Sequence, residues 1–272
     1  MQIHILNNRE PQRTPSERRH SKTPSAGSYI AATMKTTIFF VFICAAVDGS
    51  GKHHSFPQEM TWIEAQAYCR EHHTDLSFVS REKEQEMLQT ATGERFLFGW
   101  IGLHRDAVNR SVWKWSGGGK QGEQTVVILR ADGKWNDRRP TDLWPFYCFS
   151  LTAVEVKKTW EGALEYCRET HTDLTTLQSD TEQLLTLSEI QHVGITGRVW
   201  IGLRFLGDHW LWVNGDPMVY ENWRQGDQEH QCPLRKRCGA LNKEGHWENW
   251  DCEEKLHFIY MTTKAEQTKT KK

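Results

Sequence analysis

An internal repeat constrains this sequence more than any other feature. Residues 61–76 recur as residues 159–174, displaced by 98 positions, and eleven of the sixteen residues are identical. Later segments return in the same order, because Trp100-Ile101-Gly102-Leu103 is repeated as Trp200-Ile201-Gly202-Leu203. A period near 100 residues is too long for a solenoid unit, which has about 20 to 50 residues. The repeat therefore predicts two homologous domains with separate cores.

Each copy is predicted to start with helices and continue with strands. A Trp, an Ala and the Cys lie at helical spacing in both copies, which places the cysteine on the buried face of a first helix. In the second copy, Ser179 and Glu182 have the spacing of a capping box that begins a second helix. Strands are predicted at 100–103, 112–115, 125–130 and 146–149, with counterparts in the second copy. Helices followed by strands with Gly-rich turns predict an α+β fold.

The N-terminal residues indicate the compartment. Met34 and Lys35 precede ten apolar residues, 38–47, and small residues follow, a pattern typical of a secretory signal peptide over 34–50. Residues 1–33 form a doubtful leader, and translation from Met34 is one interpretation. The alternative is a type II membrane anchor, but the apolar run is about half of the roughly 20 residues that cross a bilayer. We predict a secreted, extracellular protein with no membrane span, domains at 54–149 and 150–263, and a Lys-rich tail at 264–272.

Charge and motifs exclude two classes of function. The formal net charge is −1, so the chain has no overall basic field for nucleic acid. The sequence lacks the metalloprotease, nucleophile-elbow and phosphate-loop motifs. We therefore expect no catalytic residue, and a binding protein in place of an enzyme.

The cysteine count predicts disulfides. Removal of the signal peptide takes Cys44 and leaves six cysteines, an even number that indicates a disulfide framework in a secreted chain. A zinc site is the alternative, although no C-x-x-C pair is present. Its candidate ligands are His230, Cys232, Cys238, His246 and Cys252.

The order of motifs resembles a known family. A helix with Trp and Cys, then Thr-Asp-Leu, Trp-Ile-Gly-Leu, a long irregular stretch, Trp-Asn-Asp and an aromatic strand ending in Cys is similar to the C-type lectin-like domain, here present twice. The resemblance implies that each domain has two helices and small antiparallel sheets in a double-loop fold with joined chain ends. It also implies a long loop as the binding surface, and non-enzymatic recognition of carbohydrate or glycoprotein.

The resemblance also implies a disulfide pairing. Cys69 is expected to bond Cys148, and Cys238 is expected to bond Cys252. In the second copy Tyr260 stands where the partner of Cys167 belongs. Three states remain open for Cys167, which are a bond to Cys232, a bond to another chain, and a buried thiol.

Sugar-binding members of the family hold calcium with a Glu-Pro-Asn motif and with the Asn-Asp of Trp-Asn-Asp. In the first copy Trp135-Asn136-Asp137 is present, but Trp115 and Trp135 are 20 residues apart, against 35 between the corresponding tryptophans of the second copy. The shorter loop lacks the segment for the first motif, and calcium needs six to eight oxygen ligands. We therefore expect no calcium-dependent lectin site in the first domain, where Asn136 and Asp137 are hairpin-turn residues.

In the second copy the loop is complete but its residues differ. Asp227, Gln228 and Glu229 replace Glu-Pro-Asn, while Glu248 and Asn249 follow Trp247. Acids replace amide donors, which is the wrong pattern for the hydroxyls of mannose or galactose. Asp227, Glu229, Glu248 and Asn249 are candidate calcium ligands, and calcium in this domain is the one cofactor these residues suggest. The alternative is that the acids are solvated loop residues.

Two further features suggest a ligand without calcium. Arg235-Lys236-Arg237 is a cationic cluster suited to sulfate, sialate or an acidic protein. Trp250 offers a flat face for a sugar or a protein. The alternative function is therefore a calcium-independent module that binds protein or an anionic ligand. Asn109 begins a glycosylation sequon.

Overall fold

The computed structural model describes residues 52–91, 98–106, 109, 111–116, 125–169, 172–226 and 228–261. All of them belong to one compact unit. The predicted leader 1–33, signal peptide 34–50 and tail 264–272 lie outside the described residues, as do Arg110 and Asp227.

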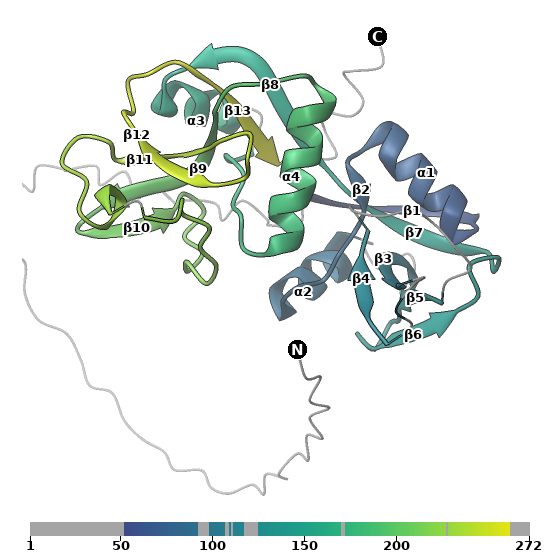
Figure 1. The fold of residues 1–272 in the computed structure, drawn as a ribbon. Helices are drawn as coiled ribbons and strands as arrows, with labels where there is room; N and C mark the ends of the chain where they lie inside the picture. The colour runs from purple at the N-terminus through teal and green to yellow at the C-terminus, as the bar shows by residue number, and fades with distance from the viewer. Residues whose placement is uncertain are drawn as a thin grey trace, which may run out of the picture. The chain divides into compact units, whose positions relative to one another are not determined.

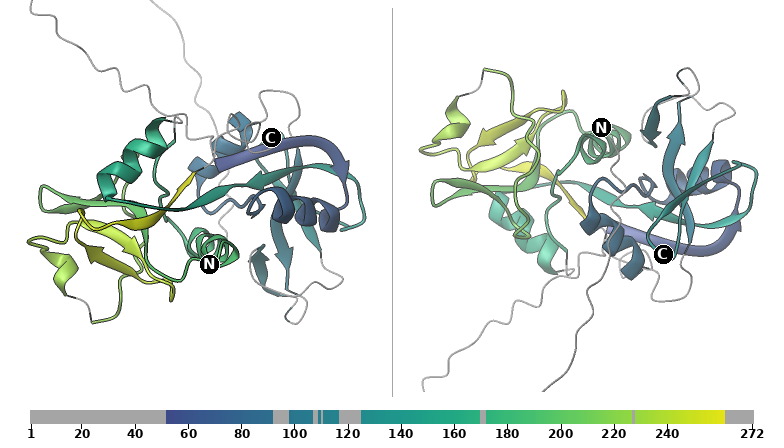
Figure 2. Two further views of the ribbon diagram at one scale, coloured as in Figure 1. Left: turned by 90° about the horizontal axis from the view of Figure 1, so that it is seen from above. Right: turned by 90° about the horizontal axis from the view of Figure 1, so that it is seen from below.

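The first domain combines helices with one mixed sheet (Figure 1). In chain order its elements are β1 (His53–Met60), α1 (Trp62–His72), β2 (Asp75–Leu76), α2 (Glu82–Ala91), β3 (Gly99–Arg105), β4 (Trp113–Trp115), β5 (Val126–Leu129), β6 (Trp135–Arg138) and β7 (Trp144–Phe149). The strand order is β1-β7-β3-β5-β6, with β2 beside β7 and β4 beside β3. Strands β1 and β7 pair antiparallel and run side by side in Figure 2, so the two ends of the domain are joined.

The second domain repeats this topology. Its elements are β8 (Leu151–Lys158), α3 (Trp160–Glu169), α4 (Asp180–His192), β9 (Val199–Leu206), β10 (His209–Trp212), the 3-10 helix η2 (Glu229–Gln231), β11 (Cys238–Leu241), β12 (Trp247–Trp250) and β13 (Leu256–Met261). Read from the first strand, the order is β8-β13-β9-β11-β12, which matches the first sheet strand for strand. The predicted α+β fold with two tandem domains is confirmed.

Polar side chains start the helices. Thr61 and Glu64 form a complete capping box at α1. At α4 only half of the predicted box forms, because the Ser179 hydroxyl accepts the N–H of Glu182 at 3.2 Å but the Glu182 carboxylate does not return to Ser179. That carboxylate accepts the N–H of Gln178 at 2.6 Å and pairs with Lys52.

The tryptophans that repeat form equivalent core contacts. The indole N–H groups of Trp62 and Trp160 donate to the carbonyls of Ile101 and Ile201, both at 3.0 Å. Trp100 and Trp200 are fully buried. The glycine of each Trp-Ile-Gly-Leu motif is required because a side chain would not fit there. In the second domain, a Cβ on Gly202 would lie 2.8 Å from the carbonyl oxygen of Leu174. These contacts explain why the tryptophan motif occurs in both domains.

Both predicted disulfides are present. Cys69 on α1 is bonded to Cys148 on β7, and Cys238 on β11 is bonded to Cys252. The zinc alternative is therefore wrong, since two of its ligands are consumed by a disulfide.

The second domain lacks the bond between its first helix and its last strand. Leu174 pairs with Tyr260 as Leu76 pairs with Cys148, so Tyr260 occupies the position of the absent cysteine. Cys167 is buried and Cys232 is exposed, and neither belongs to a disulfide. A bond between these two cysteines does not form in this fold.

The two cores are not wholly separate, which corrects our prediction. One buried cluster joins Phe78 and Phe149 of the first domain to Leu177 and Leu185 of the second. Only Ser150 separates β7 from β8, and this short connection places the domains against each other. The repeat could not reveal the contact, because periodicity identifies apolar side chains but not their partners.

A buried charged cluster lies at the same junction. Glu84 and Glu182 are equivalent residues of the two repeats, and both carboxylates contact the ammonium group of Lys52, Glu84 at 3.7 Å and Glu182 more closely. All three side chains are 5% exposed or less. Burial opposes the charge on Lys52, but Glu182 and Glu84 raise its pKa above the ordinary value. Burial raises the pKa of Glu182, against the attraction of Lys52. Arg81 also pairs with Glu84, at 3.5 Å, so Lys52 and Arg81 together balance one carboxylate from each domain.

Candidate functional site

The Trp-Asn-Asp motif of the first domain lies in a strand. Asn136 and Asp137 belong to β6, opposite Ile128 and Val127 of β5. The expectation that they are hairpin-turn residues is wrong, because the turn comes earlier, at residues 131–133.

An aromatic cluster fixes the long loop of the second domain. The Trp223 ring stacks on the His230 ring with centroids 4.5 Å apart and meets the Trp247 ring at 5.6 Å. The indole N–H of Trp210 donates to the carbonyl of His230 at 2.7 Å. These contacts hold the loop beside β12 in a chain that has no proline at the family's motif.

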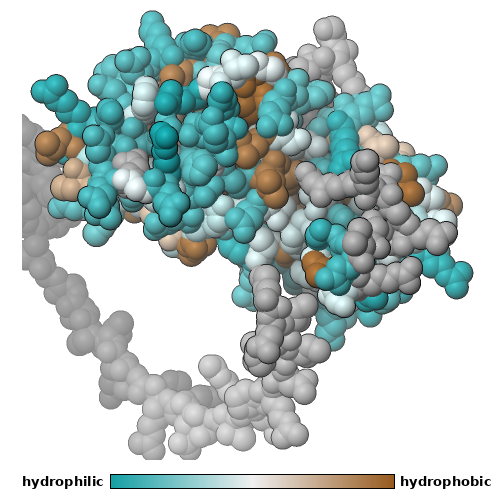
Figure 3. Space-filling model, in the orientation of Figure 1, coloured by the Kyte–Doolittle hydropathy of each residue, from teal (hydrophilic) through white to brown (hydrophobic). Residues whose placement is uncertain are grey.

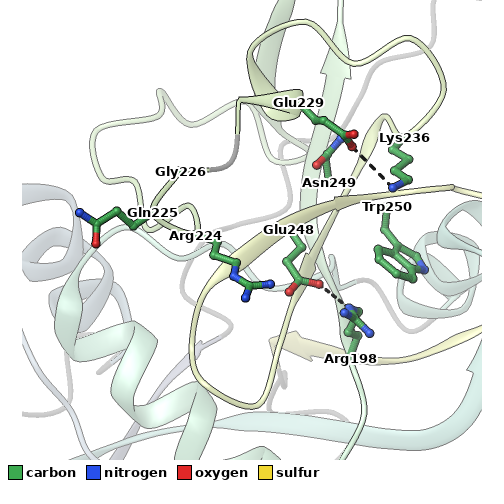
Figure 4. A pocket seen from close by; sticks show the side chains of 9 residues that line it. All are labelled: Arg198, Arg224, Gln225, Gly226, Glu229, Lys236, Glu248, Asn249 and Trp250. Carbon is green, nitrogen blue, oxygen red and sulfur yellow. Dashed lines mark hydrogen bonds and ion pairs between the residues drawn. The ribbon is translucent and has the colours of Figure 1, made fainter.

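A pocket of about 460 Å³ opens between this loop and the sheet (Figure 4). Its lining comes from three parts of the second domain, namely the residue before β9, the long loop with the following segment, and β12. The lining residues are Arg198, Arg224, Gln225, Gly226, Glu229, Lys236, Glu248, Asn249 and Trp250.

Glu248 is neutralised by its neighbours. Its Oε2 accepts Nε–H of Arg198 in an ion pair, and its Oε1 accepts the amide of Asn242 at 2.8 Å. Burial acts to raise the pKa of Glu248, but the hydrogen bonds from Arg198 and Asn242 and the charges of Arg198 and Arg224 together hold it below the ordinary value. Glu248 is therefore charged at neutral pH and has both carboxylate oxygens engaged.

Cations surround the indole of Trp250. The guanidinium carbon of Arg198 lies 4.2 Å from the centre of the ring, and the Lys236 ammonium lies 5.6 Å from it. Lys236 also pairs with Glu229 at 3.6 Å, and both of these side chains are largely exposed. In the described part of the chain, no carboxylate forms an ion pair with the exposed Arg224. Among the described lining residues, three cations thus stand against two carboxylates.

The described side chains do not fit a calcium cage. Calcium needs six to eight oxygens, yet Glu248 is occupied by Arg198 and Asn242, and Glu229 lies beside Lys236. Within the described ranges, no group of three His, Cys, Asp or Glu side chains is placed to hold a metal ion. Asp227, the remaining candidate ligand, lies outside those ranges.

The structure brings together most of the predicted ligand residues. Glu229, Lys236, Glu248, Asn249 and Trp250 all line the pocket, whereas Arg235 and Arg237 do not. The Arg237 side chain instead donates to the carbonyl of Pro233 at 3.2 Å.

Arg198 and Arg224 line the pocket but were missed from the sequence. Arg198 lies two residues before the repeated Trp200, and Arg224 directly follows Trp223. Neither arginine belongs to a motif, so only the fold reveals that they meet.

The predicted glycosylation site lies on an exposed segment. The side-chain carbonyl of Asn109 accepts the N–H of Ser111 at 3.1 Å, and Asn109 is exposed. This geometry leaves the side chain accessible to a modifying enzyme, and the modification itself stays a prediction.

Known proteins similar to this chain are multidomain receptors. The secretory phospholipase A2 receptor of Oryctolagus cuniculus is 25% identical over 245 residues, covering 74% of this chain and 17% of the receptor. The C-type mannose receptor 2 of Mus musculus is 22% identical over 271 residues, covering 76% of this chain and 18% of the receptor. The chain therefore spans about a sixth of the length of these relatives.

Solved structures of single lectin-type domains are also similar. Human lithostathine is 25% identical with a TM-score of 0.39, covering 42% of this chain and 90% of that protein. The carbohydrate-recognition domain of the mouse scavenger receptor C-type lectin is 25% identical with a TM-score of 0.36, covering 40% of this chain and 86% of that domain.

In the part of the chain that is described, no helix is both long and apolar enough to cross a bilayer. The family model for the lectin C-type domain matches residues 58–149 and again residues 156–261. With matched topology in both halves, the chain belongs to the C-type lectin domain family and carries two such domains in tandem.

Proposed function

We propose that this chain is a secreted, non-catalytic recognition protein whose second domain binds glycans or glycoproteins without calcium. The observation that carries the proposal is the engagement of Glu248 by Arg198 and Asn242 inside the pocket. This residue stands where the family's motif supplies a calcium ligand, and here an internal cation takes the place of the metal. The pocket nevertheless has the size of a small-ligand site, since such sites have about 300 to 1,000 Å³.

A protein ligand is the second candidate function. One group of relatives is named for a protein ligand, a secretory phospholipase A2, and another is named for mannose. The visible face in Figure 3 is mainly hydrophilic, with apolar residues in small groups. A face of this kind supports polar recognition more than a broad apolar interface.

Glycan-array binding of the secreted protein, with calcium and with chelator, tests the proposal. We expect binding that chelator leaves unchanged. Asp227→Asn is the matched variant, because a calcium cage would need this carboxylate and a calcium-independent pocket would not. Mannose binding that is lost both in chelator and in Asp227→Asn would contradict the proposal. Glycoprotein binding that persists after enzymatic deglycosylation would favour the protein ligand.

A further inference from the structure

The charges of the pocket define a chemical class of ligand. Arg198 has its charge matched by Glu248, with which it forms a partly buried pair beside Trp250. Arg224 and Lys236 remain as the cations on the open side, and both are exposed. The sequence had pointed to Arg235-Lys236-Arg237, but two of those residues lie outside the lining.

Arg224 and Lys236 can bind an anion without first losing a strong interaction. Arg224 pairs with no carboxylate among the described residues, and its planar guanidinium can donate two parallel hydrogen bonds to one anionic group. Besides its contact with the Trp250 ring, Lys236 pairs with Glu229 at 3.6 Å, and the two side chains of this pair are 48% and 74% exposed. Such exposed pairs contribute little, so an incoming anion can replace Glu229 without a large penalty.

The remaining lining suits a sugar ring. The amides of Gln225 and Asn249 each offer donors and an acceptor, which match hydroxyl groups. The half-buried indole of Trp250 provides an apolar face. The volume of about 460 Å³ holds a ligand of one or two sugar units but not a folded peptide surface.

We infer that this pocket recognises an acidic sugar, with Arg224 and Lys236 binding its sulfate or carboxylate group and the side chains of Gln225, Asn249 and Trp250 contacting the ring. The inference rests on the proposed function and specifies the ligand class of the same site. Sulfated and sialylated glycans share the required chemistry, and the experiment distinguishes them.

The experiment measures binding of the secreted protein to matched probes in chelator. One pair is sulfated N-acetyllactosamine and its unsulfated form, and the other is sialyllactose and lactose. We expect the charged member of at least one pair to bind about tenfold or more tightly than its neutral match, since a charge-assisted hydrogen bond has about this effect. The pair that shows the difference identifies the anionic group. Affinity should also fall as salt rises, because the cations are exposed.

Two variants and one control assign the effect to the pocket. Arg224→Gln and Lys236→Gln should each weaken binding of the charged probe about tenfold and leave the neutral probe unchanged. Arg235→Gln removes the same charge from the neighbouring position outside the lining, and should change affinity less than about twofold. Equal thermal stability of the three variants excludes unfolding as the cause.

The outcomes separate this inference from the proposed function. Chelator-resistant binding of lactose and sialyllactose with equal affinity would refute the acidic ligand while leaving glycan recognition intact. Absence of binding to every glycan would refute both. Tighter binding of an acidic peptide such as polyglutamate, or an equal loss in Arg235→Gln, would show that a diffuse positive patch binds and would overturn the inference.

Discussion

Substitution of Lys52 tests the buried cluster at the domain junction most directly. Lys52→Met keeps most of the side-chain volume but leaves Glu182, which is 2% exposed, without its counter-ion, whereas Glu84 keeps its ion pair with Arg81 at 3.5 Å. Removing one partner of a buried ion pair costs about 3 to 5 kcal/mol. For a chain of this size each kcal/mol lowers the melting temperature by about 2 to 4 °C, so we expect a decrease of about 6 to 20 °C.

Urea unfolding followed by tryptophan fluorescence measures this loss. Lys83→Met is the matched control, because Lys83 also pairs across the junction, with Asp216, but its side chain is 51% exposed. An exposed pair contributes no more than about 1 kcal/mol. Adding Glu182→Gln to Lys52→Met should restore most of the lost stability, since Glu84 keeps Arg81 as its partner and no unpaired buried carboxylate is left.

The loss of stability caused by Lys52→Met should also depend on pH. Burial raises the pKa of Glu182 even beside Lys52, and loss of the lysine raises it further. When the pKa of a carboxyl group is higher in the folded state than in the unfolded state, protonation of that group stabilises the folded state. The penalty is therefore complete above that pKa and shrinks as pH falls, so it should be smaller at about pH 5 than at about pH 7.5. A Lys52→Met penalty below about 1 kcal/mol, or one that Glu182→Gln fails to reduce, would refute the reasoning.

Three further predictions concern the disulfides and a buried histidine. Replacing Cys69 and Cys148 by alanine opens a loop of 79 positions and should cost about 4 to 5 kcal/mol in urea unfolding, and a loss below about 1 kcal/mol would contradict this. Tyr260→Cys should form a third disulfide with Cys167, detected as the loss of both thiol hydrogens in the intact mass, and persistence of both thiols would show that the two repeats differ in geometry here. Burial and then the charge of Lys52 hold the pKa of His53 well below its ordinary value, so stability should fall as pH drops below about 6.5, by no more than about 1.4 kcal/mol per pH unit. His53→Leu should abolish that part of the acid sensitivity, and an unchanged stability-pH profile would exclude His53 as its source.

The fold could be predicted from the repeat because its residues are constrained by packing. Trp62 and Trp160 make the same hydrogen bond in each domain, and Gly202 is required by the close approach of a backbone carbonyl. Strands β1 and β8 were missed because their exposure does not alternate along the strand, so they lack the period of two that indicates a half-buried strand.

The candidate site could be predicted only in part. Glu248 and Asn249 follow a recognisable tryptophan, so their place near the long loop was predictable by resemblance. The place of Arg198 was not predictable, because Arg198 and Glu248 are 50 residues apart in the sequence. They meet because β9 pairs with β11 and β11 pairs with β12, which brings the start of β9 close to Glu248 on β12. Likewise, no pattern in the sequence distinguishes Lys236, which faces the pocket, from Arg237, which bonds to its own loop.

The uneven distribution of cystines gives the two halves different mechanical properties. The Cys69–Cys148 disulfide joins the first domain near its two ends. A pulling force along the chain is therefore carried by this covalent bond, and the 79 positions that it encloses cannot extend. Among its described residues the second domain has a 14-position disulfide link, and its terminal strands are joined by backbone hydrogen bonds and side-chain packing without a covalent bond between them. A stretched molecule should lengthen by unravelling this half first, at about 3.3 to 3.6 Å per released residue.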